Sequence, residues 1–233
     1  MGGLDEMITD NKFIRENITN NGLSGKTVPF RWAHGATDEH MGDGIIVYGI
    51  IQHMRAKNCI CIGSGGGFIP RIMTQARMDL YKQGIFEGDD NYNWGDIGAT
   101  YLVDPCNDIG GPNDVSCEDS FYRNKFRPRF IKETSENAFY NFFVLQDIKI
   151  DVLFIDGDHS YEGVKKDFLL YRPLVKAGGI IVFHDIVPGA PDSAGGVSRF
   201  WQEVKNNYEY EEIVHDWKQG GLGLGIIKMN RYE

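Results

Sequence analysis

The stretch Asp151-Val-Leu-Phe-Ile-Asp156-Gly-Asp158-His159-Ser-Tyr161 decides the fold of this chain. Its first half has the length and apolar composition of a buried β-strand, and it ends abruptly in two carboxylates and an imidazole. In an open parallel sheet, the carboxyl ends of the strands line the ligand crevice. We therefore expect Asp156, Asp158 and His159 to lie together at the floor of such a crevice.

A second strand ends in the same way, because Gly178-Gly179-Ile-Ile-Val-Phe-His184-Asp185 also closes on an imidazole and a carboxylate. The segment between the two strands predicts a crossover helix, with Ser160 or Asp158 able to cap its start. Apolar residues recur on one face of this helix at Val164, Phe168 and Tyr171. A strand, a helix and a strand in this order predict neighbouring parallel strands, so the two strand ends would offer oxygen and imidazole ligands side by side.

The rest of the chain repeats this alternation from about residue 58 onward, which is typical of an α/β fold. We predict a Rossmann-like, doubly wound, mostly parallel seven-stranded sheet with helices on both faces and an antiparallel last strand. The strands are expected at 59–63, 100–104, 129–132, 151–156, 179–184, 209–214 and 222–229.

We expect a single domain over residues 41–233, preceded by a polar extension over residues 1–40 that is suited to be a lid. Residues 87–98 are too acidic to bury and are interpreted as an inserted loop. Residues 187–196 are rich in glycine and proline and directly follow the second carboxylate strand end, which favours a loop that gates a substrate.

Composition excludes several classes of protein. Hydrophobic residues make up 42% of the 233 positions, which is enough for a core, and the net charge is -9, which disfavours nucleic-acid partners. No apolar run approaches the roughly 20 residues of a membrane span, and the start lacks a leader pattern, so we expect a cytoplasmic protein. The four cysteines form no C-x-x-C pair, which argues against a zinc site, and Cys59 and Cys61 are expected to be buried thiols.

The glycine-rich turn in Cys-Ile-Gly63-Ser64-Gly65-Gly-Gly67-Phe-Ile-Pro70 follows a strand and opens a probable helix, so its backbone can approach a nucleotide-like ligand. The spacing fits neither the dinucleotide fingerprint nor the nucleoside-triphosphate loop. The next strand ends at Asp104, whose carboxylate can accept hydrogen bonds from ribose hydroxyls. The third strand runs into Ser135, where polar groups can reach an adenine edge.

Together these motifs resemble the class I S-adenosylmethionine-dependent methyltransferases, and more narrowly the metal-assisted O-methyltransferases that act on macrolide and aminocoumarin sugars. The resemblance spans about residues 40–229, and the string Asp156-Gly-Asp-His-Ser-Tyr-Glu-Gly-Val carries most of it. It implies that the glycine loop meets the methionine part of S-adenosylmethionine, that Asp104 holds the ribose and that Ser135 lies by the adenine. The residues implied to bind the cofactor are Gly63, Ser64, Gly65, Gly67, Asp104, Ser135 and Asp156.

The resemblance also implies a divalent metal, Mg²⁺ or Mn²⁺, bound by Asp156 and Asp185, with Asp158 or His159 as the general base. Relatives usually carry a carboxylate or an amide as the third ligand, where this chain has His184. Imidazole suits Mn²⁺ or Fe²⁺ better than Mg²⁺, so His184 is either the third metal ligand or a base. The implied acceptor is a hydroxyl of a small molecule, a sugar or another natural product, and a homo-oligomer stays open.

Two other functions compete with this interpretation. Asp156-Gly-Asp158 is also a D-x-D motif, which could bind a metal and a nucleotide sugar in a glycosyltransferase, although such an enzyme does not need the glycine loop. A catalytically silent protein could keep S-adenosylmethionine binding for regulation or assembly. Carboxylates and imidazoles at two strand ends disfavour that alternative, because unused buried charge is costly.

Overall fold

The computed structural model describes residues 34–36, 41–63, 67–84, 98–105, 128–191 and 193–230. Most of the expected lid and of the 87–98 insertion therefore lies outside the described residues. The chain forms two compact units, and each is described by itself. Among the helices of the described ranges, none has the length and apolar character needed to cross a membrane.

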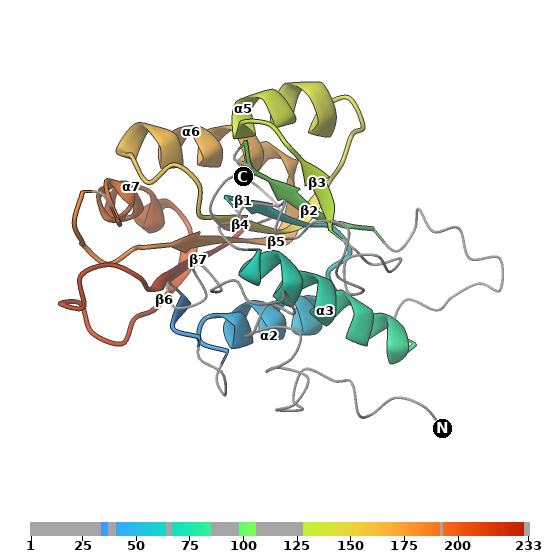
Figure 1. The fold of residues 1–233 in the computed structure, drawn as a ribbon, viewed down its shortest axis with the longest axis horizontal. Coiled ribbons are helices and arrows are strands. Elements are labelled where there is room, and N and C mark those ends of the chain that lie inside the picture. Colours follow the sequence, from blue (N-terminus) through green and yellow to red (C-terminus); the bar gives the residue numbers. More distant parts are fainter. Residues whose placement is uncertain are drawn as a thin grey trace, which may run out of the picture. The chain divides into compact units, whose positions relative to one another are not determined.

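The strands form one seven-stranded sheet in the order β3-β2-β1-β4-β5-β7-β6 (Figure 1). β4 pairs in parallel with β1 and β5, whereas β7 runs antiparallel to both β5 and β6. This confirms the predicted Rossmann-like sheet with its antiparallel last strand. The strands span Cys59–Ile62 (β1), Thr100–Val103 (β2), Arg129–Ile131 (β3), Ile150–Ile155 (β4), Val175–His184 (β5), Glu209–Ile213 (β6) and Leu224–Lys228 (β7).

Only β5 differs clearly from its expected bounds, because it begins at Val175 rather than at 179. Gly178 and Gly179 both lie inside the strand, although paired glycines often end a helix. Gly178 has a φ of 83°, and the pairing of β4 with β5 shifts register between Ile150 and Val152. The glycines therefore accommodate an irregularity within the strand instead of interrupting it.

The second unit comprises Asn58–Gly63, Leu102–Pro105 and Ile131–Glu233. Its helices are α5 (Ser135–Ala138), which continues as a π-helical turn over Phe139–Phe143, α6 (Tyr161–Tyr171) and α7 (Val197–Val204). Short 3-10 turns follow α6 at Arg172–Leu174 and α7 at Lys205–Asn207. These helices lie along one side of β4 and β5 (Figure 1).

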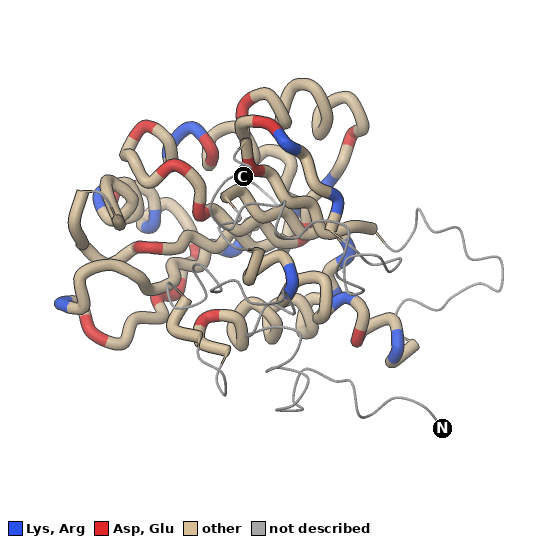
Figure 2. Tube along the Cα trace, viewed as in Figure 1, with Lys and Arg blue, Asp and Glu red and all other residues tan. Residues whose placement is uncertain are grey.

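α6 and α7 pack against β5 through a cluster of aromatic side chains. The ring of Phe183 lies 5.6 Å from that of Phe168 on α6 and 5.5 Å from that of Trp201 on α7, measured between centroids. Val164, Phe168 and Tyr171 are all buried, which confirms the predicted apolar face of α6. α6 also carries charged residues of both signs (Figure 2).

The first unit comprises Met1–Lys57, Ser64–Tyr101 and Cys106–Phe130, and its helices are α2 (Gly44–Met54) and α3 (Phe68–Lys82). Gln52 donates to the carbonyl of Ala76 at 2.7 Å, and the Tyr48 hydroxyl donates to Asp79 at 2.9 Å. His34 is buried and stacks on Phe68, with the two ring centroids 5.6 Å apart. His34 thus packs against α3 within this unit.

Candidate active site

The end of β4 is held against the end of β1. The Asp156 amide donates to the carbonyl of Ile62 at 2.8 Å. Gly63, which follows β1, has a φ of 76°, and a Cβ atom there would lie 2.0 Å from the carbonyl oxygen of Asp156. Only glycine satisfies both conditions, so the first glycine of the loop is fixed by the close approach of the neighbouring strand.

Asp185, at the end of β5, has an unusual backbone. Its φ of 61° lies in the left-handed region, which non-glycine residues adopt at a cost and which is concentrated at functional sites. The Leu222 amide donates to Asp185 Oδ1 at 2.7 Å, so the turn before β7 holds the carboxylate in place. Its second oxygen, Oδ2, faces the end of β4.

Four side chains meet at these two strand ends. His184 Nδ1 lies 3.2 Å from Asp156 Oδ1 and 3.3 Å from Asp185 Oδ2. His159 lies across the same two carboxylates, with Nε2 3.2 Å from Asp156 Oδ1 and Nδ1 3.4 Å from Asp185 Oδ2. The side chain of His184 is 2% exposed and that of His159 is 32% exposed, so the cluster is approached from the His159 side.

The two carboxylates determine the charge of His159. Its hydrogen bond to Asp156, with further contributions from Ser193 and Asp185, raises the pKa of the imidazole to about 9, although partial burial opposes this shift. His159 Nδ1 also contacts the Ser193 carbonyl oxygen. In this state His159 carries a proton at neutral pH and partly neutralises Asp156 and Asp185.

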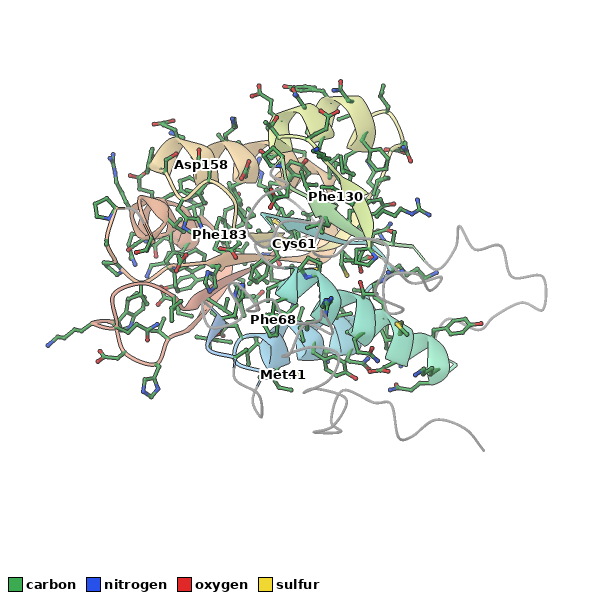
Figure 3. All side chains as sticks on the ribbon, in the orientation of Figure 1. Met41, Cys61, Phe68, Phe130, Asp158 and Phe183 are labelled. Carbon is green, nitrogen blue, oxygen red and sulfur yellow. The ribbon has the colours of Figure 1, made fainter. Side chains whose placement is uncertain are left out.

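Asp158 is not brought into this cluster, contrary to the expectation from the sequence. Its Oδ1 accepts a hydrogen bond from the Ser160 amide at 2.9 Å, and its carboxylate packs over Gly163 of α6. Figure 3 shows Asp158 beside α6. Ser160 caps α6 by accepting from the Gly163 amide at 3.0 Å. Asp158 precedes the N-cap Ser160 by two residues, so its short side chain reaches the Ser160 amide just before the helix begins.

The cofactor-side candidates lie where the first strands end. The Gly63 amide donates to the carbonyl of Val103 at 2.9 Å, and the Asp104 amide donates to Ile131 at 3.2 Å. Burial, with smaller contributions from Asp156 and Asp104, raises the pKa of the Cys61 thiol. The carboxylates predicted to serve the cofactor and the metal therefore lie near the same buried thiol.

The other glycine-loop candidates are placed differently. Ser64 and Gly65 lie outside the described residues. Gly67 belongs to the first unit, where it precedes α3 with a φ of 81°. Neither Cys59 nor Cys61 forms a disulfide, and both are buried, as predicted.

Ser135 stands at the first position of α5, whose N-cap is Thr134. The Ser135 hydroxyl donates to Asp167 Oδ1 on α6, and the Tyr171 hydroxyl donates to the Ser135 carbonyl at 2.8 Å. Sequence reasoning missed Asp167. A carboxylate between Val164 and Phe168, on the buried side of an amphipathic helix, was the signal that could have found it.

The residues fit a divalent cation. One ligand atom each from Asp156, His184 and Asp185 lies within 4.8 Å of the others. Bonds of about 2.0–2.2 Å from one ion place neighbouring ligand atoms about 3 Å apart. The distances from His184 Nδ1 to Asp156 Oδ1 and Asp185 Oδ2, 3.2 and 3.3 Å, are close to this value. Two carboxylates and one imidazole form a mixed set that suits Mn²⁺ or Fe²⁺ better than Mg²⁺.

Comparison with known proteins agrees with this geometry. A family model described as a methyltransferase domain matches residues 61–186. The fold resembles that of an O-methyltransferase from Bacillus cereus solved in complex with SAH, with a TM-score of 0.61 and 14% identity over 85% of this chain and 84% of that one. It also resembles CalS11, a TDP-rhamnose 3'-O-methyltransferase of calicheamicin biosynthesis, with a TM-score of 0.54 and 15% identity over 81% and 79% of the two chains.

One curated relative matches a short stretch of the sequence. It is the uncharacterized protein R132 of Acanthamoeba polyphaga mimivirus, with 61% identity over 36 residues. The match covers 16% of this chain and 16% of that protein.

Proposed function

The chain belongs to the methyltransferase family whose model matches residues 61–186, it has the fold of S-adenosylmethionine-dependent O-methyltransferases, and we propose that it methylates a hydroxyl group of a small molecule. The observation that carries this proposal is the cluster of Asp156, His159, His184 and Asp185 at two adjacent strand ends. A hydroxyl is a poor nucleophile, so a transferase for oxygen needs groups that orient it and accept its proton. Carboxylates and imidazoles are such groups.

His159 is the group proposed to accept the proton of the hydroxyl. It is the most exposed of the four side chains, and Asp156 orients its ring. Because its pKa is raised to about 9, His159 must release its own proton before it can act as a base. Asp158 competes for this role in the sequence, but its carboxylate binds the Ser160 amide, so the geometry favours His159.

Asp156, His184 and Asp185 would hold a divalent cation, for which Mn²⁺ is the better match and Mg²⁺ the alternative. A bound cation would supply Lewis-acid activation and orientation of the acceptor oxygen. Burial limits the rotation of His184, and the Leu222 amide limits that of Asp185, so the chain itself fixes the donor atoms.

A sugar hydroxyl, or another hydroxylated natural product, is the proposed acceptor. The support is the resemblance in fold to CalS11, whose described substrate class is a nucleotide-linked sugar. The competing nucleotide-sugar glycosyltransferase would use Asp156 and Asp158 together. Because the Asp158 carboxylate is directed to α6, that pair is not arranged to share a cation.

Calorimetric titration of S-adenosylmethionine, with and without Mn²⁺, tests the proposal on the wild-type protein and on Asp185→Asn. We expect micromolar cofactor binding in both proteins and Mn²⁺ binding in the wild type alone. Release of S-adenosylhomocysteine in the presence of nucleotide sugars and free glycosides then reports the acceptor. If the wild type binds nucleotide sugars but no S-adenosylmethionine, the methyltransferase proposal is wrong; cofactor binding without turnover on any hydroxylated acceptor would favour a silent binding protein.

A further inference from the structure

Asp167 is a buried carboxylate that the proposed chemistry does not use. It lies on α6, one turn after Gly163, and is 2% exposed. Its Oδ1 accepts the hydroxyl hydrogen of Ser135, at the start of α5. Its Oδ2 faces Gly157, where a Cβ atom would lie 3.3 Å away. One side chain of α6 therefore contacts the segments that follow both β3 and β4.

A second residue of α6 reinforces the contact with α5. Tyr171, four positions after Asp167, donates its hydroxyl to the Ser135 carbonyl at 2.8 Å. Its ring packs edge-on against Phe139 and Phe143 of the π-helical turn, with centroid distances of 5.5 and 5.4 Å. Ser135 is thus held at its hydroxyl by Asp167 and at its carbonyl by Tyr171, so its position depends on α6.

The segment after β4 lies at the point where the order of the strands reverses, whereas the segment after β3 follows the strand at the edge of the sheet. In the order β3-β2-β1-β4-β5, successive strands are added on one side of β1 and then on the other. Open α/β sheets bind their ligands at this reversal, outside the carboxyl ends of the strands. The Asp167 side chain, on α6, contacts both segments.

Packing alone does not explain a carboxylate at this position. Burial is the main reason that the pKa of Asp167 is raised to about 6, with Ser135 and Lys166 opposing the shift and Asp158 adding to it. A charged form at neutral pH is costly there, and an apolar side chain could fill the same space without that cost. Such strained ionisable groups are concentrated at functional sites.

We infer that Asp167 is a positioning residue, which fixes Ser135 and Gly157 relative to each other so that they form one wall of the S-adenosylmethionine site. This inference rests on the proposed function, because it presumes that the cofactor binds at the reversal between β1 and β4. Asp167 acts through the two segments and does not itself take part in methyl transfer.

The test is calorimetric binding of S-adenosylhomocysteine to Asp167→Ala, Asp167→Asn, Ser135→Ala and the double variant Asp167→Ala/Ser135→Ala. We expect Asp167→Ala to weaken binding at least tenfold, and Asp167→Asn, which keeps an acceptor oxygen for Ser135, to stay within threefold of the wild type. The double variant should bind S-adenosylhomocysteine at most threefold more weakly than Asp167→Ala does, since the two residues act as a unit. The matched control is Asp151→Asn, whose carboxylate bonds Lys176 at 2.7 Å and Asn58 at 2.8 Å near the start of β4, and it should bind as the wild type does.

Wild-type affinity in a folded Asp167→Ala variant overturns this inference and leaves the proposed function intact. Failure of the wild-type protein to bind S-adenosylhomocysteine or S-adenosylmethionine overturns the proposed function and this inference with it. If Asp167→Ala does not fold, Ser135→Ala decides, because wild-type affinity without the Ser135 hydroxyl overturns the inference as well.

Discussion

At the scale of single residues, Asp167 links stability to pH. Its ordinary pKa near 3.8 rises to about 6 in the folded protein, so folding favours the protonated form. Its contribution to stability is therefore full below pH 4 and is lost as the pH rises through 6. A shift of this size corresponds to a ceiling of about 3 kcal/mol.

Asp167→Asn should remove this penalty. We expect the variant to be about 1–2 kcal/mol more stable than the wild type at pH 7.5, with a difference that shrinks toward zero at pH 4. Urea unfolding across this pH range measures the effect. A constant difference between the two proteins at all pH values would show that the carboxyl group does not titrate as described.

Glycine is required at positions 63 and 178 for different physical reasons. Both have a positive φ, but a Cβ atom at Gly63 would collide with the Asp156 carbonyl, whereas the space at Gly178 is open. Gly178→Ala should cost about 1–2 kcal/mol for backbone strain alone, and Gly63→Ala should cost more than about 3 kcal/mol. Chemical denaturation of both variants tests this order, and equal losses would contradict it.

The sequence predicts well which residues of the site lie together, but it predicts their hydrogen bonds less well. Asp156, His159, His184 and Asp185 meet because residues that follow adjacent parallel strands must lie at the same edge of a sheet. The orientation of Asp158 depends on competition for one backbone amide. No periodic pattern encodes such a choice, and the same applies to the Ser135 hydroxyl, which turns to Asp167.

At the scale of elements, α6 carries much of the site. It follows His159 directly, its start is capped by Ser160, and Asp167 and Tyr171 hold α5 from its other turns. A disturbance at its first turn is therefore expected to reach the cluster of strand-end residues.

Ser160→Ala removes the cap and should cost about 1 kcal/mol of stability. Mn²⁺ affinity should fall in parallel, because His159 and Asp156 lie in the segment that enters α6. Thermal unfolding and metal titration measure the two effects. Ser198→Ala, at the second position of α7, whose N-cap Gly196 makes no side-chain hydrogen bond, is the control, and an equal loss in that variant would show that the cap is not responsible.

The strands and long helices were predictable because their apolar residues repeat with the period of the element. The start of β5 was not, since paired glycines end many helices and here lie within a strand that shifts register. The π-helical turn over Phe139–Phe143 was also missed. It differs from an α-helix by one residue in its hydrogen bonding, a difference that the spacing of aromatic residues does not reveal.

At the scale of the whole molecule, the net charge of -9 should favour a cation at the carboxylate cluster. Charges spread over the surface act through solvent and are screened by salt, whereas the direct ligands are screened much less. We expect Mn²⁺ affinity to fall about three- to tenfold between 20 and 300 mM KCl, with cofactor affinity changing less. Titrations at several KCl concentrations measure this, and an unchanged Mn²⁺ affinity would assign the attraction to the local ligands alone.

The insertion of β7 between β5 and β6 has a consequence for synthesis on the ribosome. β5 emerges with one edge unpaired, and its partner β7 follows only after α7 and β6 have been translated. Until then Asp185 also lacks the Leu222 amide that holds its carboxylate. A nascent chain can thus assemble β1 and β4 early, but it completes the end of the site that holds Asp185 only after β7 has left the exit tunnel.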